Sequence, residues 1–336
     1  MSLRSPVDVQ THFLPPTMVS VLDGRDEPPH IVEHDGTRLV AYGPGAAYPL
    51  VDAMVDIEAK LAAMDQGDVG ASVLSVNIPG LDLFDAADAP AVARALNDEL
   101  GDLVRTHPDR LAALAVLPMQ APAAAAEELT RAVSAGLQGA MVYSNVAGRA
   151  LDEPDFRPVF AAAAEADAPI LIHPTYPLSA ASLDAYALIP VLGFLFDTST
   201  ATLRLILDGV YDRHPDLKLI LGHVGGVLPY IVGRIDYESG RIPGGTGALT
   251  VPPSEHLRKL YVDTVSNWPP ALSLALDFFG ADRILWASDH PFWDPHKTHE
   301  ALAALDLDAD AQQRIEHDNV VSLFPLLEDS APRTTA

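Results

Sequence analysis

Eight short apolar runs alternate with longer stretches of helical period, and this alternation restricts the possible folds more than any other feature. The runs lie at 6–10, 71–76, 112–117, 138–143, 169–173, 217–222, 259–264 and 284–288. Amphipathic stretches rich in Ala, Leu and Glu lie between most of them, at 53–67, 90–106, 122–135, 155–167, 197–213, 269–279 and 298–304. Such alternation predicts a parallel β-sheet covered by helices, and the apolar character of the runs fits strands buried on both faces. The length of 336 residues is within the range of one α/β barrel.

The chain shows no second domain, internal repeat or linker. We therefore predict a single barrel domain over 1–328, with an insertion at about 13–52 after the first strand and a disordered polar tail at 329–336. Asp35-Gly36 lies between two short apolar runs in the insertion and predicts a β-hairpin over 30–42. Residues 174–196 and 238–258 are expected to be long loops, suited to a lid or a subunit contact.

Composition excludes several classes of partner. The chain has 46 acidic and 21 basic residues, and its formal charge of −25 opposes binding to nucleic acid or anionic membranes. It has no cysteine, which excludes disulfides and thiolate ligands. We see no signal peptide and no apolar run long enough to cross a bilayer, so we expect a cytoplasmic protein that acts on a small molecule.

Four of the predicted strands end in a residue that can bind a divalent metal: His12, His173, His223 and Asp289. Because the carboxyl ends of barrel strands meet at one mouth, these side chains are expected to converge. Each has a simpler explanation when taken alone: a hydrogen-bonded histidine, a packed histidine before a glycine turn, or an N-cap aspartate. Their shared placement at strand ends favours a functional site, and neutral imidazole is the commonest protein ligand of zinc-like metals.

The order of these segments resembles the amidohydrolase superfamily, specifically its decarboxylase branch. That branch includes aminocarboxymuconate semialdehyde, resorcylate and carboxyvanillate decarboxylases. The resemblance covers the chain nearly end to end, through the segments 8–15, 151–158, Pro169-Ile-Leu-Ile-His-Pro174, Leu219-Ile-Leu-Gly-His-Val-Gly-Gly226, 228–236, 260–264, 280–292 and 319–324.

The resemblance implies a (β/α)8 TIM barrel of the metal-dependent hydrolase type with one divalent ion. Its ligands would be the residue at the position of Gln10, with His12, His173 and Asp289, while His223 would contact the metal-bound water or the substrate and move protons. Family members carry His or Glu where this chain has Gln10. A neutral amide oxygen suits Mn²⁺ or Mg²⁺ better than Zn²⁺.

Gln10 leaves three interpretations open. In the first, Gln10 is a weak fourth ligand or a hydrogen-bond donor behind the other ligands. In the second, it lowers the affinity of the site for metal. In the third, the site works without metal. A polar residue hydrogen-bonded beneath the barrel mouth is a further explanation for Gln10 itself. Zinc and manganese are both candidate metals, and magnesium is compatible with an oxygen ligand.

Substrate contacts are less well defined by the resemblance. Arg234 matches an arginine that, in some relatives, reaches a substrate carboxylate in the neighbouring subunit, but it could equally form a salt bridge on its own helix. A second anchoring arginine has no secure counterpart, so a less charged aromatic acid is compatible with the chain. Phe292, Trp293 and Tyr176 lie beside the predicted ligands, where they would suit a flat ring or simply pack their loops.

The sequence thus predicts a metal-dependent, non-oxidative decarboxylase of an aromatic or unsaturated carboxylic acid, in which Asp289 or His223 delivers a proton. The alternative on the same barrel is hydrolysis of an amide, a lactone or a vinylogous C–C bond, with or without metal. A non-catalytic binding protein, in which Gln10 marks a decayed site, is the remaining alternative. The resemblance also implies a homodimer or homotetramer.

Overall fold

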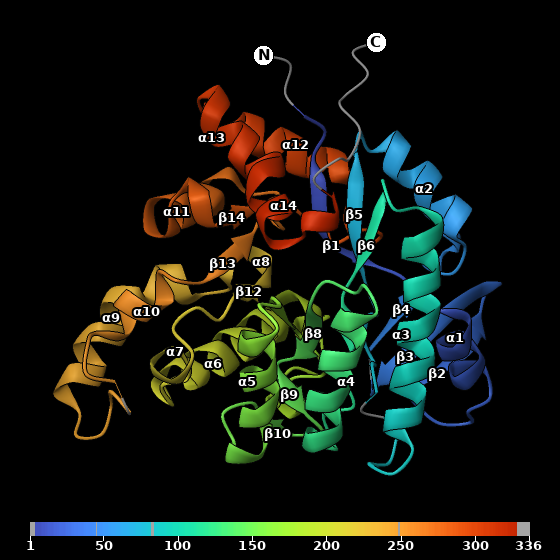
Figure 1. Cartoon of the computed structure of the whole chain (residues 1–336), viewed down its shortest axis with the longest axis horizontal. Coiled ribbons are helices and arrows are strands. Elements are labelled where there is room, and N and C mark those ends of the chain that lie inside the picture. The colour runs from blue at the N-terminus through green and yellow to red at the C-terminus, as the bar shows by residue number, and fades with distance from the viewer. Residues whose placement is uncertain (1–3, 45, 82–83, 248, 328–336) are drawn as a thin grey trace.

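The computed structural model describes residues 4–44, 46–81, 84–247 and 249–327. Within that part of the chain, eight parallel strands form the centre of the molecule (Figure 1). They are β1 (Val7–His12), β5 (Ala71–Ser75), β6 (Leu111–Ala113) continued by β7 (Ala115–Val116), β8 (Ala140–Tyr143), β11 (Ile170–His173), β12 (Leu219–Leu221), β13 (Tyr261–Asp263) and β14 (Ile284–Leu285). Each of the eight runs predicted from the sequence overlaps one of these strands, although β1 extends two residues beyond the predicted run 6–10.

Backbone hydrogen bonds close the strands into a ring. β1, β5 and β6 are neighbours in that order, and β7, β8, β11, β12, β13 and β14 follow one another in the same way. Leu114 lies between β6 and β7 and joins the two sets. Its N–H donates to Leu74 O on β5 at 2.9 Å. On the far side, Val9 N donates to Trp286 O at 3.0 Å, and Asp289 N donates to Gln10 O at 2.9 Å. The predicted barrel is confirmed.

Helices cover the outside of the barrel, as the periodic stretches predicted. The main ones are α2 (Ile57–Gln66), α3 (Ala89–Thr106), α4 (Pro122–Ser134), α5 (Arg157–Glu165), α6 (Phe194–Leu207), α7 (Val210–Arg213), α11 (Pro269–Phe279) and α12 (Pro295–Ala303). Smaller elements are α8 (Gly222–Gly225), α13 (Ala309–Gln313), α14 (Asn319–Leu323) and the pair β9 (Asn145–Val146) and β10 (Arg149–Ala150). On α3, the fully buried Ala93, Leu96 and Leu100 recur at helical spacing and face the core.

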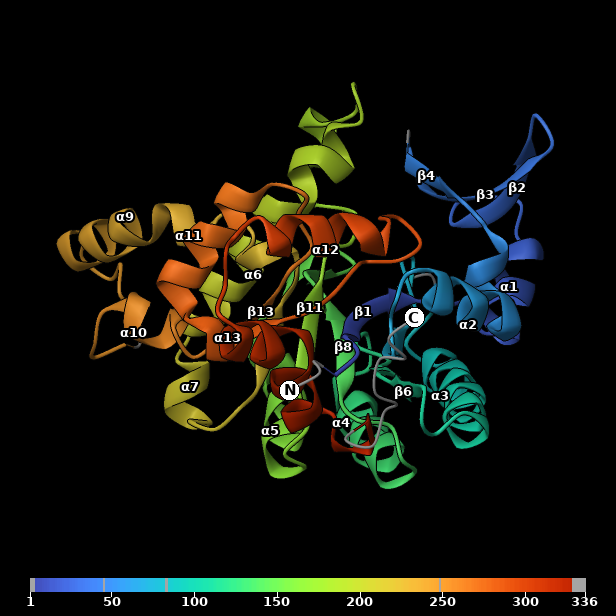
Figure 2. The same ribbon diagram turned by 90° about the horizontal axis from the view of Figure 1, so that it is seen from above.

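The insertion after β1 contains a small antiparallel sheet that stands away from the barrel strands (Figure 2). The sheet consists of β2 (His30–His34), β3 (Thr37–Gly43) and β4 (Ala46–Pro49), and α1 (Pro16–Asp23) precedes it. Asp35 and Gly36 have φ values of 50° and 76°, the left-handed conformation that a two-residue hairpin turn requires. The predicted hairpin is therefore confirmed, whereas β4 and α1 were not predicted.

Two predicted loops are partly wrong. Residues 238–258 were expected to be a loop, but α9 (Leu228–Arg241) extends into this segment and α10 (Pro253–Leu257) lies near its end. Residues 174–196 also end in helix, since α6 begins at Phe194. The first loop thus contains a helix end and the whole of α10, and the second also contains the helical segment Ile189–Gly193, because Pro252-Pro253 and Gly193 do not mark these boundaries by pattern alone. The predicted tail at 329–336 lies outside the described residues.

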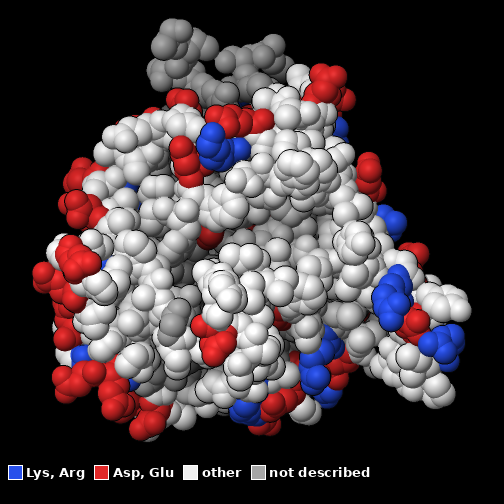
Figure 3. All heavy atoms as spheres, turned by 180° about the vertical axis from the view of Figure 1, so that it is seen from behind, with Lys and Arg blue, Asp and Glu red and all other residues white. Residues whose placement is uncertain are grey.

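The segment Ile189–Leu207 is, among the described residues, the one helix that is long and apolar enough to cross a membrane by length and composition. The prediction that no run reaches that length is therefore wrong. In this structure the segment is a barrel helix, because Asp197 at its centre is buried and accepts hydrogen bonds from Ser144 and Asn145 at the end of β8. Most acidic side chains lie at the surface. On the face of the molecule in Figure 3, Asp and Glu gather at the rim around a largely uncharged centre.

Candidate metal centre

Three of the predicted ligands converge at the carboxyl ends of β1, β11 and β14. His12 ends β1, His173 ends β11, and Asp289 follows β14. All three are buried, and one potential ligand atom from each lies within 4.8 Å of the others. Residues that are 116 or more positions apart in the sequence thus form one cluster, which is compatible with a single divalent ion.

Neighbouring acceptors orient both imidazoles so that one ring nitrogen is available to a metal. Ser75 Oγ donates to Thr11 O at 3.2 Å and lies 3.1 Å from His12 Nδ1, so it can accept from a protonated Nδ1. His173 Nδ1 lies 2.7 Å from Pro174 O, a carbonyl that can only accept. Both rings therefore carry a proton on Nδ1 and present Nε2 as a lone pair. Burial, followed by the nearby His12, lowers the pKa of His173 well below its usual value, which favours the neutral ring that a metal needs.

Asp289 brings the negative charge of the cluster. Its Oδ1 lies 2.8 Å from His12 Nε2 and accepts from Gln10 Nε2 at 2.9 Å. Burial acts to raise the pKa of Asp289, but the contacts with His12 and His223 outweigh it and hold the pKa below its usual value. With His12 protonated on Nδ1, its Nε2 and Asp289 Oδ1 are both acceptors, and a cation between them resolves this conflict. The donor set fits a divalent metal.

His223 lies beside the cluster in a strained loop. It follows β12, and its backbone has φ 58° and ψ 53°, with Val224 and Asp289 also at positive φ. Such left-handed non-glycine residues cost free energy and are concentrated at functional sites. Its Nε2 is 3.8 Å from Asp289 Oδ2. Burial acts to lower the pKa of His223, but Asp289 outweighs it and the pKa is raised. His223 is thus suited to hold a proton next to the metal centre.

The remaining predicted residues have different positions. Gln10 is fully buried and contacts Asp289. The Phe292 ring makes an edge contact with His12 at 5.7 Å between ring centroids, whereas Trp293 packs against the hydrophobic core. Arg234 is exposed on α9 and does not belong to the cluster, and Glu238 pairs with Arg241 instead of with Arg234.

A row of aromatic rings leads from the metal centre to a cavity at the barrel mouth. Phe292 contacts Tyr48 at 5.3 Å, and Tyr48 contacts Tyr42 at 5.9 Å between ring centroids. Tyr42 and Tyr176 line a cavity of about 420 Å³ between the insertion and the ends of β8 and β11, a volume suited to a small ligand. No charged side chain is among the described residues that line it. Tyr176 thus lines this cavity, Phe292 lies between the cavity and His12, and their contact with a substrate stays a prediction.

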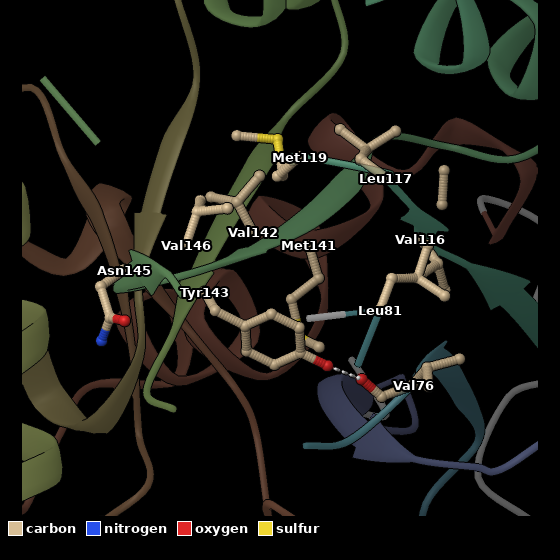
Figure 4. A pocket seen from close by; sticks show the side chains of 11 residues that line it. Val76, Leu81, Val116, Leu117, Met119, Met141, Val142, Tyr143, Asn145 and Val146 are labelled. Carbon is tan, nitrogen blue, oxygen red and sulfur yellow. Dashed lines mark hydrogen bonds between the residues drawn. The ribbon is translucent and has the colours of Figure 1, made fainter. Parts of the chain in front are cut away.

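A second cavity is too small for a substrate. It lies at the ends of β5, β7 and β8, and its volume is about 10 Å³, enough for at most one water molecule (Figure 4). Tyr143 crosses it and donates a hydrogen bond to Val76 O at 2.8 Å. The same ring makes an edge contact with His173, with 6.1 Å between the two ring centroids.

Sequence reasoning missed several residues that support the cluster. Ser75 orients His12, and Asp263 accepts from Val224 N at 3.0 Å and so holds the loop that carries His223. Lys60 is fully buried, and its Nζ contacts Thr11 Oγ1 at 2.9 Å and His290 Nδ1 at 3.0 Å. Ser75 and Asp263 do lie at strand ends, which was an available signal. Lys60 gave none, because lysine on an amphipathic helix normally faces solvent.

Comparisons with known proteins agree with this geometry. The family model described as amidohydrolase matches residues 7–326. The gamma-resorcylate decarboxylase of Rhizobium sp. (strain MTP-10005) is 31% identical over 296 residues, which cover 81% of this chain and 88% of that protein. The crystal structure of 5-carboxyvanillate decarboxylase from Sphingomonas paucimobilis is 27% identical, with a TM-score of 0.85 and coverage of 96% of this chain and 99% of that one.

A third similar protein was crystallised with a metal. Dihydroxybenzoic acid decarboxylase from Polaromonas sp. JS666, with bound manganese and the inhibitor 2-nitroresorcinol, is 27% identical. Its TM-score is 0.82, and the match covers 96% of this chain and 98% of that one. From the family match over nearly the whole chain, and from relatives that are decarboxylases, we conclude that this protein belongs to the amidohydrolase family and to its decarboxylase branch.

Proposed function

We propose that this protein is a metal-dependent, non-oxidative decarboxylase of an aromatic or unsaturated carboxylic acid. The observation that carries the proposal is the convergence of His12, His173 and Asp289 at the barrel mouth, with His223 beside them. A bound divalent ion would be held by these three ligands and would supply a Lewis acid for the substrate carboxylate and an adjacent oxygen.

The protein's own groups would carry out the proton transfer. A proton from His223, whose pKa Asp289 raises, is added to the ring carbon that bears the carboxylate, which makes this carbon tetrahedral. The bond to the carboxylate then breaks, CO₂ leaves, and its bonding electrons restore the aromatic ring. The proton gained by carbon and the CO₂ released balance the reaction, so no oxidant or reductant is needed. Phe292 and Tyr48 would keep water away from one side of the substrate.

The cavity narrows the substrate class. Its described lining consists of uncharged residues, among them Tyr42, Asn145 and Tyr176. A second carboxylate would lose its hydration there without gaining a cation. We therefore propose a substrate with one carboxylate, bound at the metal, and an uncharged ring whose substituents extend into the cavity. A hydroxybenzoic acid has this chemistry.

Manganese is the metal we propose. One carboxylate and two imidazoles give a mixed oxygen and nitrogen set, which suits Mn²⁺ and which an amide oxygen from Gln10 would extend. A similar decarboxylase was crystallised with this metal. Zinc would bind the same two imidazoles, and magnesium would prefer more oxygen ligands, so all three ions belong in a reconstitution experiment.

The decisive experiment is to remove metal with a chelator, restore Mn²⁺, Zn²⁺ or Mg²⁺ separately, and screen hydroxybenzoic acids for CO₂ release. We expect one ion per chain and CO₂ release that depends on it. Consumption of an amide or lactone without CO₂ would instead support the hydrolase. Failure to bind any of the ions, with no turnover of either kind, would support the non-catalytic binding protein.

The domain and assembly are also proposals. We propose one catalytic domain that works in the cytoplasm. We also propose that it forms a homodimer, because exposed apolar side chains gather at the start of α6 and on the helical segment Ile189–Gly193 before it. Val191 is 67% exposed, Leu192 42% and Phe196 49%. Single exposed apolar side chains are common on protein surfaces, whereas a cluster of them indicates an interface. Light scattering should give the mass of a dimer, and Val191→Glu with Phe196→Glu should give that of a monomer. A monomeric wild-type protein would contradict this assembly.

A further inference from the structure

Two buried oxygen atoms next to the metal centre have no hydrogen-bond partner among the described residues: Gln10 Oε1 and Asp263 Oδ2. Both residues are fully buried. They face the same space, because a Cβ atom added to Gly222 would lie 2.8 Å from Gln10 Oε1 and 3.3 Å from Asp263 Oδ2. Leaving a buried acceptor unpaired costs free energy, so two of them in one place require an explanation.

The Asp263 carboxylate cannot turn away from this space. Its Oδ1 accepts from Val224 N and from Val265 N, each at 3.0 Å. These two backbone donors fix the carboxylate and point Oδ2 toward the gap above Gly222. What Oδ2 lacks is a donor, and the side-chain amide of Gln10 faces the same gap above Gly222.

The Gln10 amide has two possible orientations that differ by half a turn. In the orientation shown, Nε2 donates to Asp289 Oδ1 at 2.9 Å and Oε1 faces the gap. The oxygen and nitrogen of an amide have almost the same shape, so the hydrogen-bond partners decide the orientation. Half a turn brings Nε2 toward Asp263 Oδ2 and brings Oε1 next to Asp289 Oδ1, on the side of the metal ligands.

We propose that Asp263 is a positioning residue that holds the Gln10 amide in this turned orientation, with its oxygen facing the metal as a fourth ligand. This inference rests on the proposed metal centre. The turned amide gives Asp263 Oδ2 its missing donor, and it gives Gln10 Oε1 a cation in place of an empty gap. A carboxylate that accepts from the amide N–H also makes the amide oxygen more basic, which compensates for replacing a charged or imidazole ligand with a neutral one. Gly222 is required because a side chain there would fill the space between the two groups.

A competing arrangement satisfies the same atoms. If Asp263 is protonated, its O–H can donate to Gln10 Oε1, and Gln10 Nε2 then stays on Asp289, outside the metal's ligands. The two arrangements differ in which partner donates across the gap, and the isosteric variant Asp263→Asn separates them. Val224 N and Val265 N need an acceptor, so the asparagine oxygen would face them and its NH₂ group would face Gln10.

The experiment is to measure the Mn²⁺ dissociation constant of metal-free Asp263→Asn by competition with a chelator. In our proposal the asparagine NH₂ attracts Gln10 Oε1 and turns it away from the metal, so affinity falls by about 10–100-fold. In the competing arrangement the asparagine imitates the protonated carboxyl, and affinity stays unchanged. Unchanged affinity would overturn the proposal.

Exchanging the donor and the acceptor between positions 10 and 263 should restore the Mn²⁺ affinity that Asp263→Asn loses. In Gln10→Glu with Asp263→Asn, one glutamate oxygen accepts from the asparagine NH₂ and the other faces the metal, so we expect affinity to return at least to the wild-type value. Gln10→Glu alone places two carboxylates across the gap and should bind Mn²⁺ more weakly than the double variant. A double variant as weak as Asp263→Asn would also contradict the proposal.

Glu128→Gln is the matched control, because it neutralises a buried carboxylate on α4 that is bonded to Asn97 and Arg131, outside the metal centre. Its Mn²⁺ affinity should equal that of the wild type. These measurements do not depend on turnover. If wild-type protein binds no Mn²⁺, the proposed function fails, whereas if it binds Mn²⁺ and Asp263→Asn binds it equally well, only the role of Asp263 fails.

Discussion

At the scale of single residues, the site separates groups that hold a metal from a group that holds a proton. His12, His173 and Asp289 form the ligand cluster, while His223 Nε2 is 3.8 Å from Asp289 on a strained loop. We expect His223→Asn to keep metal binding and to lose about 10²–10⁴-fold in turnover, because a positioned general acid contributes a factor of that size. Metal analysis and CO₂ release measured on the same sample test this, and full turnover would exclude His223 as the acid.

The serine beneath His12 allows a second prediction at this scale. In Ser75→Ala, His12 Nδ1 loses its acceptor, so the ring is less firmly held with Nε2 toward the metal. We expect Mn²⁺ affinity to fall by about tenfold. Ser72→Ala is a matched control on the same strand, since Ser72 is also buried but has no hydrogen-bond partner among the described residues. Equal affinities in the two variants would show that Ser75 does not orient His12.

At the scale of helices and strands, the sequence predicted what depends on periodicity and missed what depends on tertiary contacts. The eight strand runs and the Asp35-Gly36 hairpin have strong local signals, and strand ends located His12, His173, His223 and Asp289. The strand β4 was missed because its four residues acquire their structure only by pairing with β3. The support given by Lys60 was missed because burial of a charged group on a helix is decided by its tertiary neighbours. Asp263 was missed although its place at the end of β13 was an available signal.

The segment after β11 owes its position to one carboxylate on α6. Asp197 accepts from Leu178 N at 3.1 Å, from Ser144 Oγ at 2.5 Å and from Asn145 Nδ2 at 3.0 Å. Leu178 and Asn145 line the cavity at the barrel mouth. Asp197→Ala leaves three donors without their acceptor, so we expect a loss of about 3 kcal/mol in unfolding free energy and a raised KM.

Denaturant unfolding and steady-state kinetics check the Asp197 prediction. Asp102→Ala is the control, because Asp102 is exposed on α3 and its carboxylate pairs with Arg105 at the surface. A destabilised variant with unchanged KM would mean that Asp197 stabilises the fold without shaping the substrate cavity.

At the scale of the whole molecule, charge is distributed very unevenly between surface and interior. The chain has a net charge of −25, yet one of its lysines, Lys60, is fully buried between α2 and the ends of β1 and β14. Lys60 extends from α2 to Thr11 and His290, and so links the outer helix to the two strand ends that carry His12 and Asp289. Burial is the main cause that lowers the pKa of Lys60 from 10.5 to about 7, and Asp8 and Asp289 only partly oppose it.

This shift makes the stability of the barrel depend on pH in a defined direction. Below about pH 7, Lys60 is protonated in both the folded and the unfolded chain and contributes no slope. Between about pH 7 and pH 10.5, only the unfolded chain keeps the proton, so the free energy of unfolding rises with pH, by at most about 1.4 kcal/mol per unit. Lys60→Met, which keeps the length of the side chain, should remove this rise.

Measured in metal-free protein by denaturant unfolding, the stability of the wild type relative to Lys60→Met should therefore increase from about pH 7 to about pH 9. Lys218→Met, which removes a lysine from a surface ion pair with Asp167, is the control for losing a lysine as such. A difference between wild type and Lys60→Met that stays constant with pH would show that Lys60 keeps its proton inside the barrel as a permanent cation.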